Sequence, residues 1–76
     1  MQLTAIAVLK TREVDIHDEW FAVHVKENRG SWQMMSGVEL RADEAFRALV
    51  ALGLMSERAV ELIHQAREQF GYRPGN

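Results

Sequence analysis

The sequence predicts an α+β fold, in which a three-stranded antiparallel sheet is followed by a helical hairpin packed on one face of the sheet, as a two-layer sandwich. Along residues 20–40, bulky and polar residues alternate on either side of the turn signal Asn28-Arg29-Gly30, which is typical of a β-hairpin. After Leu40 the spacing of apolar residues changes from two to about 3.6, which is typical of amphipathic helices. We therefore expect one domain over residues 1–76, with a β-meander at 1–40, a helical hairpin at 41–71 and a tail at 72–76.

The composition is that of an ordinary small globular domain, with 47% hydrophobic and 26% charged residues. The net charge is −2 with both signs interleaved, which disfavours nucleic-acid binding. There is no cysteine, so a disulfide framework and a thiolate metal site are both excluded. No segment approaches the ~20 apolar residues of a membrane span, and Lys10 and Arg12 follow the first apolar run, the reverse of a secretory signal. We expect a cytoplasmic protein of bacterial or phage type with no membrane partner.

The first strand is predicted at Thr4 to Leu9, which is apolar on both faces apart from the threonine. One face carries Leu3, Ala5, Ala7 and Leu9, and the other carries Ile6 and Val8. A strand of this kind usually lies in the middle of a sheet or is covered on both faces. The polar stretch from Thr11 to Glu19 is taken as a loop with some strand character.

The hairpin that follows is predicted to turn at Gly30, because glycine can adopt the positive φ of a glycine-bulge turn. Lys26 then pairs with Ser31, Val25 with Trp32, Val23 with Met34, and Phe21 with Ser36. The side beneath the helices is expected to carry Phe21, Val23, Val25, Trp32, Met34 and Val38. The other side is expected to carry Trp20, Ala22, His24, Lys26, Ser31, Gln33, Met35 and Gly37. The reverse assignment leaves far more apolar area uncovered and is rejected.

Two helices are predicted after the sheet, each with an apolar stripe facing inward. The first stripe is Ala42, Ala45, Phe46, Leu49 and Val50, and Gly53 ends this helix. Ser56 is the predicted N-cap of the second helix, with Met55 and Val60 as its hydrophobic staple. The second helix is expected to run to about Phe70 and to stop at Gly71. Its inward residues are Ala59, Val60, Ile63, Ala66 and Phe70, and its outward residues are Glu57, Glu61, Arg67 and Glu68.

The sheet face away from the helices is the predicted functional surface. There Trp20 is expected to cover Gly37 and Ala22 to lie across from Met35, giving an apolar centre with a polar rim. The predicted interface residues are Trp20, Ala22, His24, Gln33 and Met35, and the rim also includes Lys26 and Arg29. We therefore expect a non-enzymatic protein-interaction module without a cofactor, acting as a regulator, an inhibitor or an assembly factor. It is expected to self-associate, as a two-fold dimer through the sheet face or through an edge strand.

The alternative hypothesis is a small-ligand, metal-binding or catalytic module. Asp15, His17, Asp18 and Glu19 gather in the Asp15–Glu19 segment, with His24 farther along, and imidazole with carboxylate suits divalent metals. Their spacing matches no known ligand motif, so no metal site is predicted. His64 could pair with Glu61 or Glu68, but we identify no nucleophile–base arrangement and no glycine-rich phosphate loop.

DNA binding through a helix-turn-helix over Ala48–Ile63 is the third hypothesis. It is disfavoured because its second helix exposes acidic residues, and because Leu49 stands where a small residue is usual.

Overall fold

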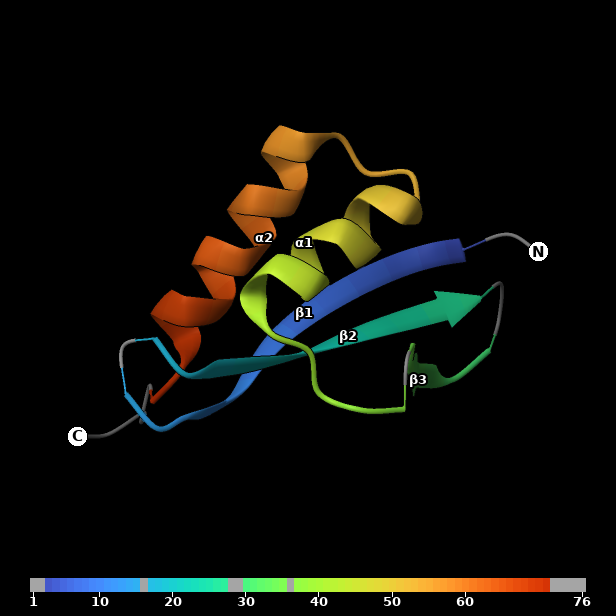
Figure 1. The fold of residues 1–76 in the computed structure, drawn as a ribbon. Coiled ribbons are helices and arrows are strands. Elements are labelled where there is room, and N and C mark those ends of the chain that lie inside the picture. Colours follow the sequence, from blue (N-terminus) through green and yellow to red (C-terminus); the bar gives the residue numbers. More distant parts are fainter. Residues whose placement is uncertain (1–2, 16, 28–29, 36, 72–76) are drawn as a thin grey trace.

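The computed structural model describes residues 3–15, 17–27, 30–35 and 37–71. Within them the elements are β1 (Leu3–Glu13), β2 (Glu19–Glu27), β3 (Trp32–Met34), α1 (Ala42–Ala51) and α2 (Ser56–Gln69). The strands form one antiparallel sheet in the order β1-β2-β3. Both helices lie on the same side of this sheet (Figure 1). The predicted α+β architecture is confirmed. The predicted tail at 72–76 lies outside the described residues.

β1 and β2 form a hairpin with a shorter connection than the loop predicted for residues 11–19, because residues 11–13 belong to β1 and Glu19 belongs to β2. The backbone N–H of Val14 donates to the Asp18 carbonyl at 3.0 Å, and the N–H of Asp18 donates to the Asp15 carbonyl at 3.0 Å. The Asp15 carboxylate also accepts the backbone N–H of His17 at 2.8 Å, an interaction typical of tight turns. β1 therefore lies at the edge of the described sheet and β2 at its centre, which corrects the expectation of a central or doubly covered first strand.

The register predicted between β2 and β3 is wrong by one residue. Lys26 pairs with Trp32, Val25 with Gln33, and His24 with Met34. Gly30 does not adopt the positive φ of the predicted turn. The first paired residues are Lys26 and Trp32, so five residues, 27–31, separate them, where the predicted pair of Lys26 with Ser31 leaves four. Because side chains alternate along a strand, this one-residue shift moves every β3 side chain to the other face. The turn residues Asn28 and Arg29 lie outside the described residues.

The core lies between the sheet and the helices. β1 contributes Val8 and β2 contributes Phe21 and Val23, whose exposed fractions are 7%, 0% and 1%. They pack against the buried helical residues Ala45, Leu49, Ala59, Ile63 and Ala66. The faces predicted for β1 from Ala5 to Leu9 and for β2 are therefore confirmed. The predicted burial of Trp32, Met34 and Val38 is wrong, because these side chains are 48%, 36% and 61% exposed.

The chain leaves the sheet after β3 and returns at one point. There Leu40 forms an isolated bridge with Phe21, through hydrogen bonds of 2.7 and 2.8 Å between their backbones. The predicted pair of Phe21 with Ser36 is thus replaced, and Ser36 itself lies outside the described residues. Trp20 likewise pairs with Arg12 on β1 rather than covering Gly37.

α1 ends as predicted: Gly53 has a φ of 103°, and the N–H of Leu54 donates to the Leu49 carbonyl at 3.2 Å. The predicted cap of α2 is wrong by one residue, because Met55 is the N-cap and Ser56 is already helical. Met55 and Val60 consequently lack the spacing of a hydrophobic staple, and they are 73% and 45% exposed.

The end of α2 departs from its predicted stripes at two positions. Phe70 was expected to face inward but is 38% exposed, and Arg67 was expected to face outward but reaches the sheet. The stop predicted at Gly71, with a φ of 78°, is confirmed.

Candidate interaction surface

The sheet face turned away from the helices is the candidate functional surface, and we call it the open face. Residues that pair directly across antiparallel strands share a face, so the registers define its members. These are Ala5, Ala7, Leu9 and Arg12 of β1, Trp20, Ala22, His24 and Lys26 of β2, and Trp32 and Met34 of β3. Figure 1 shows both helices on the opposite side, so no described helix covers this face.

The middle of the open face is apolar and uneven. Leu9, Trp32 and Met34 are 49%, 48% and 36% exposed, which is high for side chains of this size and type. Beside them the small side chain of Ala7 leaves room for a hollow of about 340 Å³, which is lined by Ala7, Leu9, His24 and Trp32. The face therefore offers both protruding apolar side chains and a depression able to receive one.

The charged residues of the open face are basic. Arg12 lies toward one end and Lys26 toward the other, and the described residues that form the face include no carboxylate. Apolar residues in the middle with polar residues at the margins are typical of protein–protein contact surfaces.

Trp20 is clamped between two arginine side chains. The guanidinium carbon of Arg12 lies 3.8 Å from the centroid of the indole ring and that of Arg41 lies 4.0 Å from it. Arg41 also forms an ion pair with Asp18 at 2.8 Å, which fixes its position at the start of α1. These cation–π contacts tie β1, β2 and α1 together. The geometry thus gives Trp20 a structural role in place of the cover over Gly37 expected from the sequence.

The five predicted interface residues do not all share one face. Trp20, Ala22 and His24 belong to the open face, although Ala22 is only 2% exposed. Gln33 pairs with Val25 and so lies on the helix side of the sheet. Met35 is 37% exposed but follows the last residue of β3. The face predicted for Gln33 is therefore wrong for the same reason as the register.

Sequence reasoning missed the residues that make the open face apolar. Alternation along the first strand placed Leu9 on the side of Ala5 and Ala7, but the sequence left open which side that strand shared with the hairpin. Trp32 and Met34 were assigned to the core, and only the length of the β2–β3 loop could have reversed that assignment.

His24 lies at the centre of the open face with an unsatisfied nitrogen. It pairs with Ala7 on one side and with Met34 on the other, so its neighbours across both strands are apolar. Its Nδ1 atom is buried and has no hydrogen-bond partner among the described residues. A buried polar atom without a partner costs about 1–3 kcal/mol of stability.

We therefore expect His24→Leu to raise the free energy of unfolding by about 1 kcal/mol, because it removes the unsatisfied nitrogen and keeps a side chain of similar size. Urea denaturation measures this difference. The matched control is His64→Leu on the exposed surface of α2, which we expect to change stability by less than about 0.5 kcal/mol. Destabilisation by His24→Leu would mean that Nδ1 has a partner in solution.

The side chains of the alternative site, which is the Asp15–Glu19 segment with His24, do not come together in the structure. Asp18 is paired with Arg41, and Glu19 faces the helices, whereas His24 belongs to the open face. Asp15 closes its own turn. In the part of the chain that the structure describes, no three His, Asp or Glu side chains stand close enough to hold a metal ion.

A charged cluster on the helix side fastens the end of α2 to the sheet. Glu19 accepts two hydrogen bonds from the Arg67 guanidinium, at 2.8 and 2.9 Å, and lies 3.0 Å from the Lys10 ammonium. Lys10 is also 3.2 Å from Glu13, and its ammonium lies 4.8 Å from the centroid of the Phe70 ring. The side chains of Lys10 and Glu19 are only 6% and 14% exposed.

These contacts shift the pKa values of the cluster. Hydrogen bonds from Arg67, and secondarily from Lys10, lower the pKa of Glu19 to about 2 although burial opposes this. Burial disfavours the charged form of Lys10, but its ion pairs with Glu19 and Glu13 outweigh that effect and raise its pKa. These shifts favour the charged forms of Lys10 and Glu19 at neutral pH, and the arrangement is that of a structural ion-pair network.

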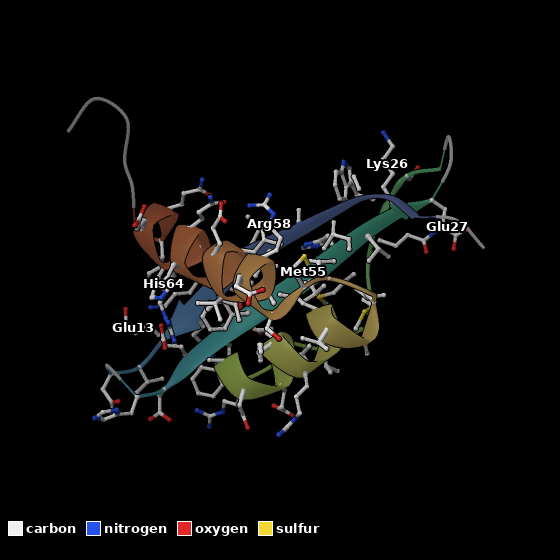
Figure 2. The ribbon with its side chains drawn as sticks, turned by 90° about the horizontal axis from the view of Figure 1, so that it is seen from above. Glu13, Lys26, Glu27, Met55, Arg58 and His64 are labelled. Atoms are coloured by element: carbon white, nitrogen blue, oxygen red, sulfur yellow. The ribbon has the colours of Figure 1, made fainter. Side chains whose placement is uncertain are left out.

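A second hollow lies between the two helices. It has a volume of about 250 Å³ and is lined chiefly by Phe46 of α1 and by Val60, Ile63 and His64 of α2. Glu61, one of the two carboxylates expected to pair with His64, instead accepts hydrogen bonds from Arg58 at 2.7 Å and from Gln65 at 3.2 Å. Figure 2, seen from above, places His64 on α2 toward the end of β1 that carries Glu13.

No protein family model, curated protein or solved structure matches the chain. Within the described residues, no helix has both the length and the apolar character needed to span a bilayer.

Proposed function

We propose that this chain is a small non-enzymatic protein-interaction module, and that it self-associates through the open face. The observation that carries the proposal is an apolar sheet face that no described helix covers, while the other face is packed against both helices. The role could be that of a regulator, an inhibitor or an assembly factor.

The energetics support contact rather than permanent exposure. Full burial of a side chain the size of leucine or methionine contributes about 1.5–3 kcal/mol, and Leu9, Trp32 and Met34 are each exposed by a third or more. A domain of this length has little stability to spare, so such side chains are costly to leave in water. Association recovers that free energy.

A second copy is a suitable occupant because the open face carries both exposed apolar side chains and a hollow that can receive one. A two-fold axis lying between two such faces brings the protruding Trp32 or Met34 of each copy toward the hollow beside Ala7 of the other. Two sheets packed in this way are about 10 Å apart, which leaves room for one interdigitated layer of side chains.

Sedimentation velocity over a series of concentrations tests the proposal. We expect the wild type to associate, and we expect Met34→Lys to weaken the association at least tenfold by placing a charge within the apolar contact. The matched control is Met55→Lys, because Met55 is 73% exposed between the two helices, away from the open face (Figure 2). The control is expected to associate like the wild type.

Two outcomes contradict the proposal. A wild type that stays monomeric at millimolar concentration rejects self-association. Equal association of Met34→Lys and Met55→Lys rejects the open face as the contact surface.

A further inference from the structure

We propose that β1 also pairs antiparallel with β1 of a second copy, so that two three-stranded sheets join into one sheet of six strands. This contact is a different surface from the open face and goes beyond the function proposed above. β1 has 11 residues and lies at the edge of the described sheet, with β2 as its only neighbouring strand there.

The middle of the β1 edge, from Ala5 to Leu9, lacks the usual protection against pairing. Natural proteins block exposed edges with charges, prolines, bulges or very short strands. From Ala5 to Leu9 the strand has no charged residue and no proline, and its register is regular between the two irregular points near Thr4 and Thr11. The opposite edge, β3, has only three residues. β1 is therefore the edge of the described sheet that is suited to pairing.

The helices leave part of this edge accessible. α2 packs over β1, whereas α1 packs over β2. Figure 2 shows α2 crossing above one end of β1, with the end nearer the N-terminus extending beyond the helix. In an antiparallel pair, the covered end of each β1 lies beside the uncovered end of the other. The two α2 helices are consequently displaced from each other along the strands.

The alternation of faces restricts the register. Residues directly opposite each other in an antiparallel pair point to the same side of the sheet. A symmetric pair therefore keeps the helices of both copies on one side of the joined sheet only if each β1 residue lies opposite a residue of the same face. A pair centred on Ala7 meets this condition and places Ile6 opposite Val8 and Ala5 opposite Leu9 of the second copy. On the open side of the strand, the two Ala7 side chains then lie opposite each other at the axis, and each Ala5 lies opposite the larger Leu9.

The neighbouring registers are less favourable. Centring the pair on Val8 places Ile6 opposite Lys10, whose ammonium is held in the cluster with Glu19. Centring it on Ile6 extends the pairing across the irregularity between Leu3 and Ala5. The geometry thus points to Ala7 as the residue at the two-fold axis.

The size of the open face gives a further reason for this contact, which rests on the function proposed above. The nine residues of β2 extend about 30 Å, and three strands span about 14 Å. The resulting footprint of roughly 400 Å² is small beside the ~800 Å² that each partner buries in a standard interface. Pairing at β1 joins the open faces of the two copies into one continuous surface, which has twice the footprint of a single open face.

Single-cysteine variants test the pairing directly, because the chain has no cysteine of its own. In the proposed register the two Ala7 Cα atoms lie about 4.5–5.5 Å apart, within the range that a disulfide bridges. We expect Ala7→Cys to form a covalent dimer under mild oxidation, as seen by non-reducing electrophoresis. Ala5→Cys is the matched control, since its two Cα atoms are offset by four residues, or about 14 Å along the strands.

A mixture and a double variant complete the test. Ala5→Cys mixed with Leu9→Cys should give a mixed disulfide dimer, because these residues lie opposite each other in the proposed register. Ala7→Cys should still cross-link when Met34→Lys is present, because Met34 belongs to the open face and not to the edge.

Cross-linking of Ala7→Cys no greater than that of Ala5→Cys overturns the edge pairing, and so does its loss with Met34→Lys. If the wild type nevertheless associates and Met34→Lys weakens it, the function proposed above stands alone. If Ala7→Cys cross-links and Met34→Lys leaves wild-type association unchanged, the edge contact stands and the open-face contact fails.

Discussion

Phe21→Ala is expected to lower the free energy of unfolding by about 3–5 kcal/mol, because it removes the largest fully buried side chain of the core. Phe21 is fully buried at the centre of the sheet, and the Arg67 guanidinium lies 5.7 Å from the centroid of its ring. Small domains have only about 5–15 kcal/mol of stability in total, so this loss leaves a substantial unfolded population. Urea denaturation followed by circular dichroism measures it.

Trp32→Ala is the informative comparison, because the sequence alone predicted both aromatic residues to lie beneath the helices. In the structure Trp32 is 48% exposed on the open face. We therefore expect its replacement to cost less than about 1 kcal/mol in dilute, monomeric protein. Losses of similar size for Phe21→Ala and Trp32→Ala would contradict the observed register of β3.

Acidification is expected to remove the second large contribution to stability. The pKa of Glu19 is lowered to about 2 in the folded protein, against 4.5 for an unperturbed glutamate, chiefly by hydrogen bonds from Arg67. A lowered pKa stabilises the fold fully above pH 4.5, and this stabilisation is lost progressively as the pH falls toward 2. A shift of this size corresponds to about 3 kcal/mol, and the carboxylate is only 14% exposed, so solvent screening is limited.

Glu19→Gln should therefore destabilise the protein by up to about 3 kcal/mol at pH 7 and flatten the dependence of stability on pH between 4.5 and 2. Denaturation curves recorded across this range measure both effects. Glu61→Gln is the control, because its ion pair with Arg58 joins two half-exposed side chains and is worth less than about 0.5 kcal/mol. If Glu19→Gln and Glu61→Gln have equal effects, the cluster at the end of α2 is not an important contact.

Much of this fold follows from local patterns in the sequence. Alternation assigned Phe21 and Val23 to the buried face of β2, and a period of 3.6 assigned Ala45 and Leu49 to the buried stripe of α1. Glycine at position 53 marked the end of α1 because glycine readily adopts a positive φ. These features depend on residues close together in the chain, which is why the sequence predicts them.

The open face was harder to predict because it depends on relations between strands. The edge position of β1 comes from its pairing with β2, and no local pattern states which of several apolar strands is central. The sides of Trp32 and Gln33 depend on whether four or five residues separate the strands. Arg67 likewise appears outward by its position in the helix, but its long side chain reaches Glu19, 48 residues away in the sequence.

The number of residues between β2 and β3 determines which side chains of β3 lie on the open face. Successive side chains of a strand point to opposite faces, so a change of one residue in the loop decides whether the indole of Trp32 or the amide of Gln33 lies on the open face. A single-codon insertion or deletion there would exchange the two sets of β3 side chains while β1, β2 and both helices kept their places.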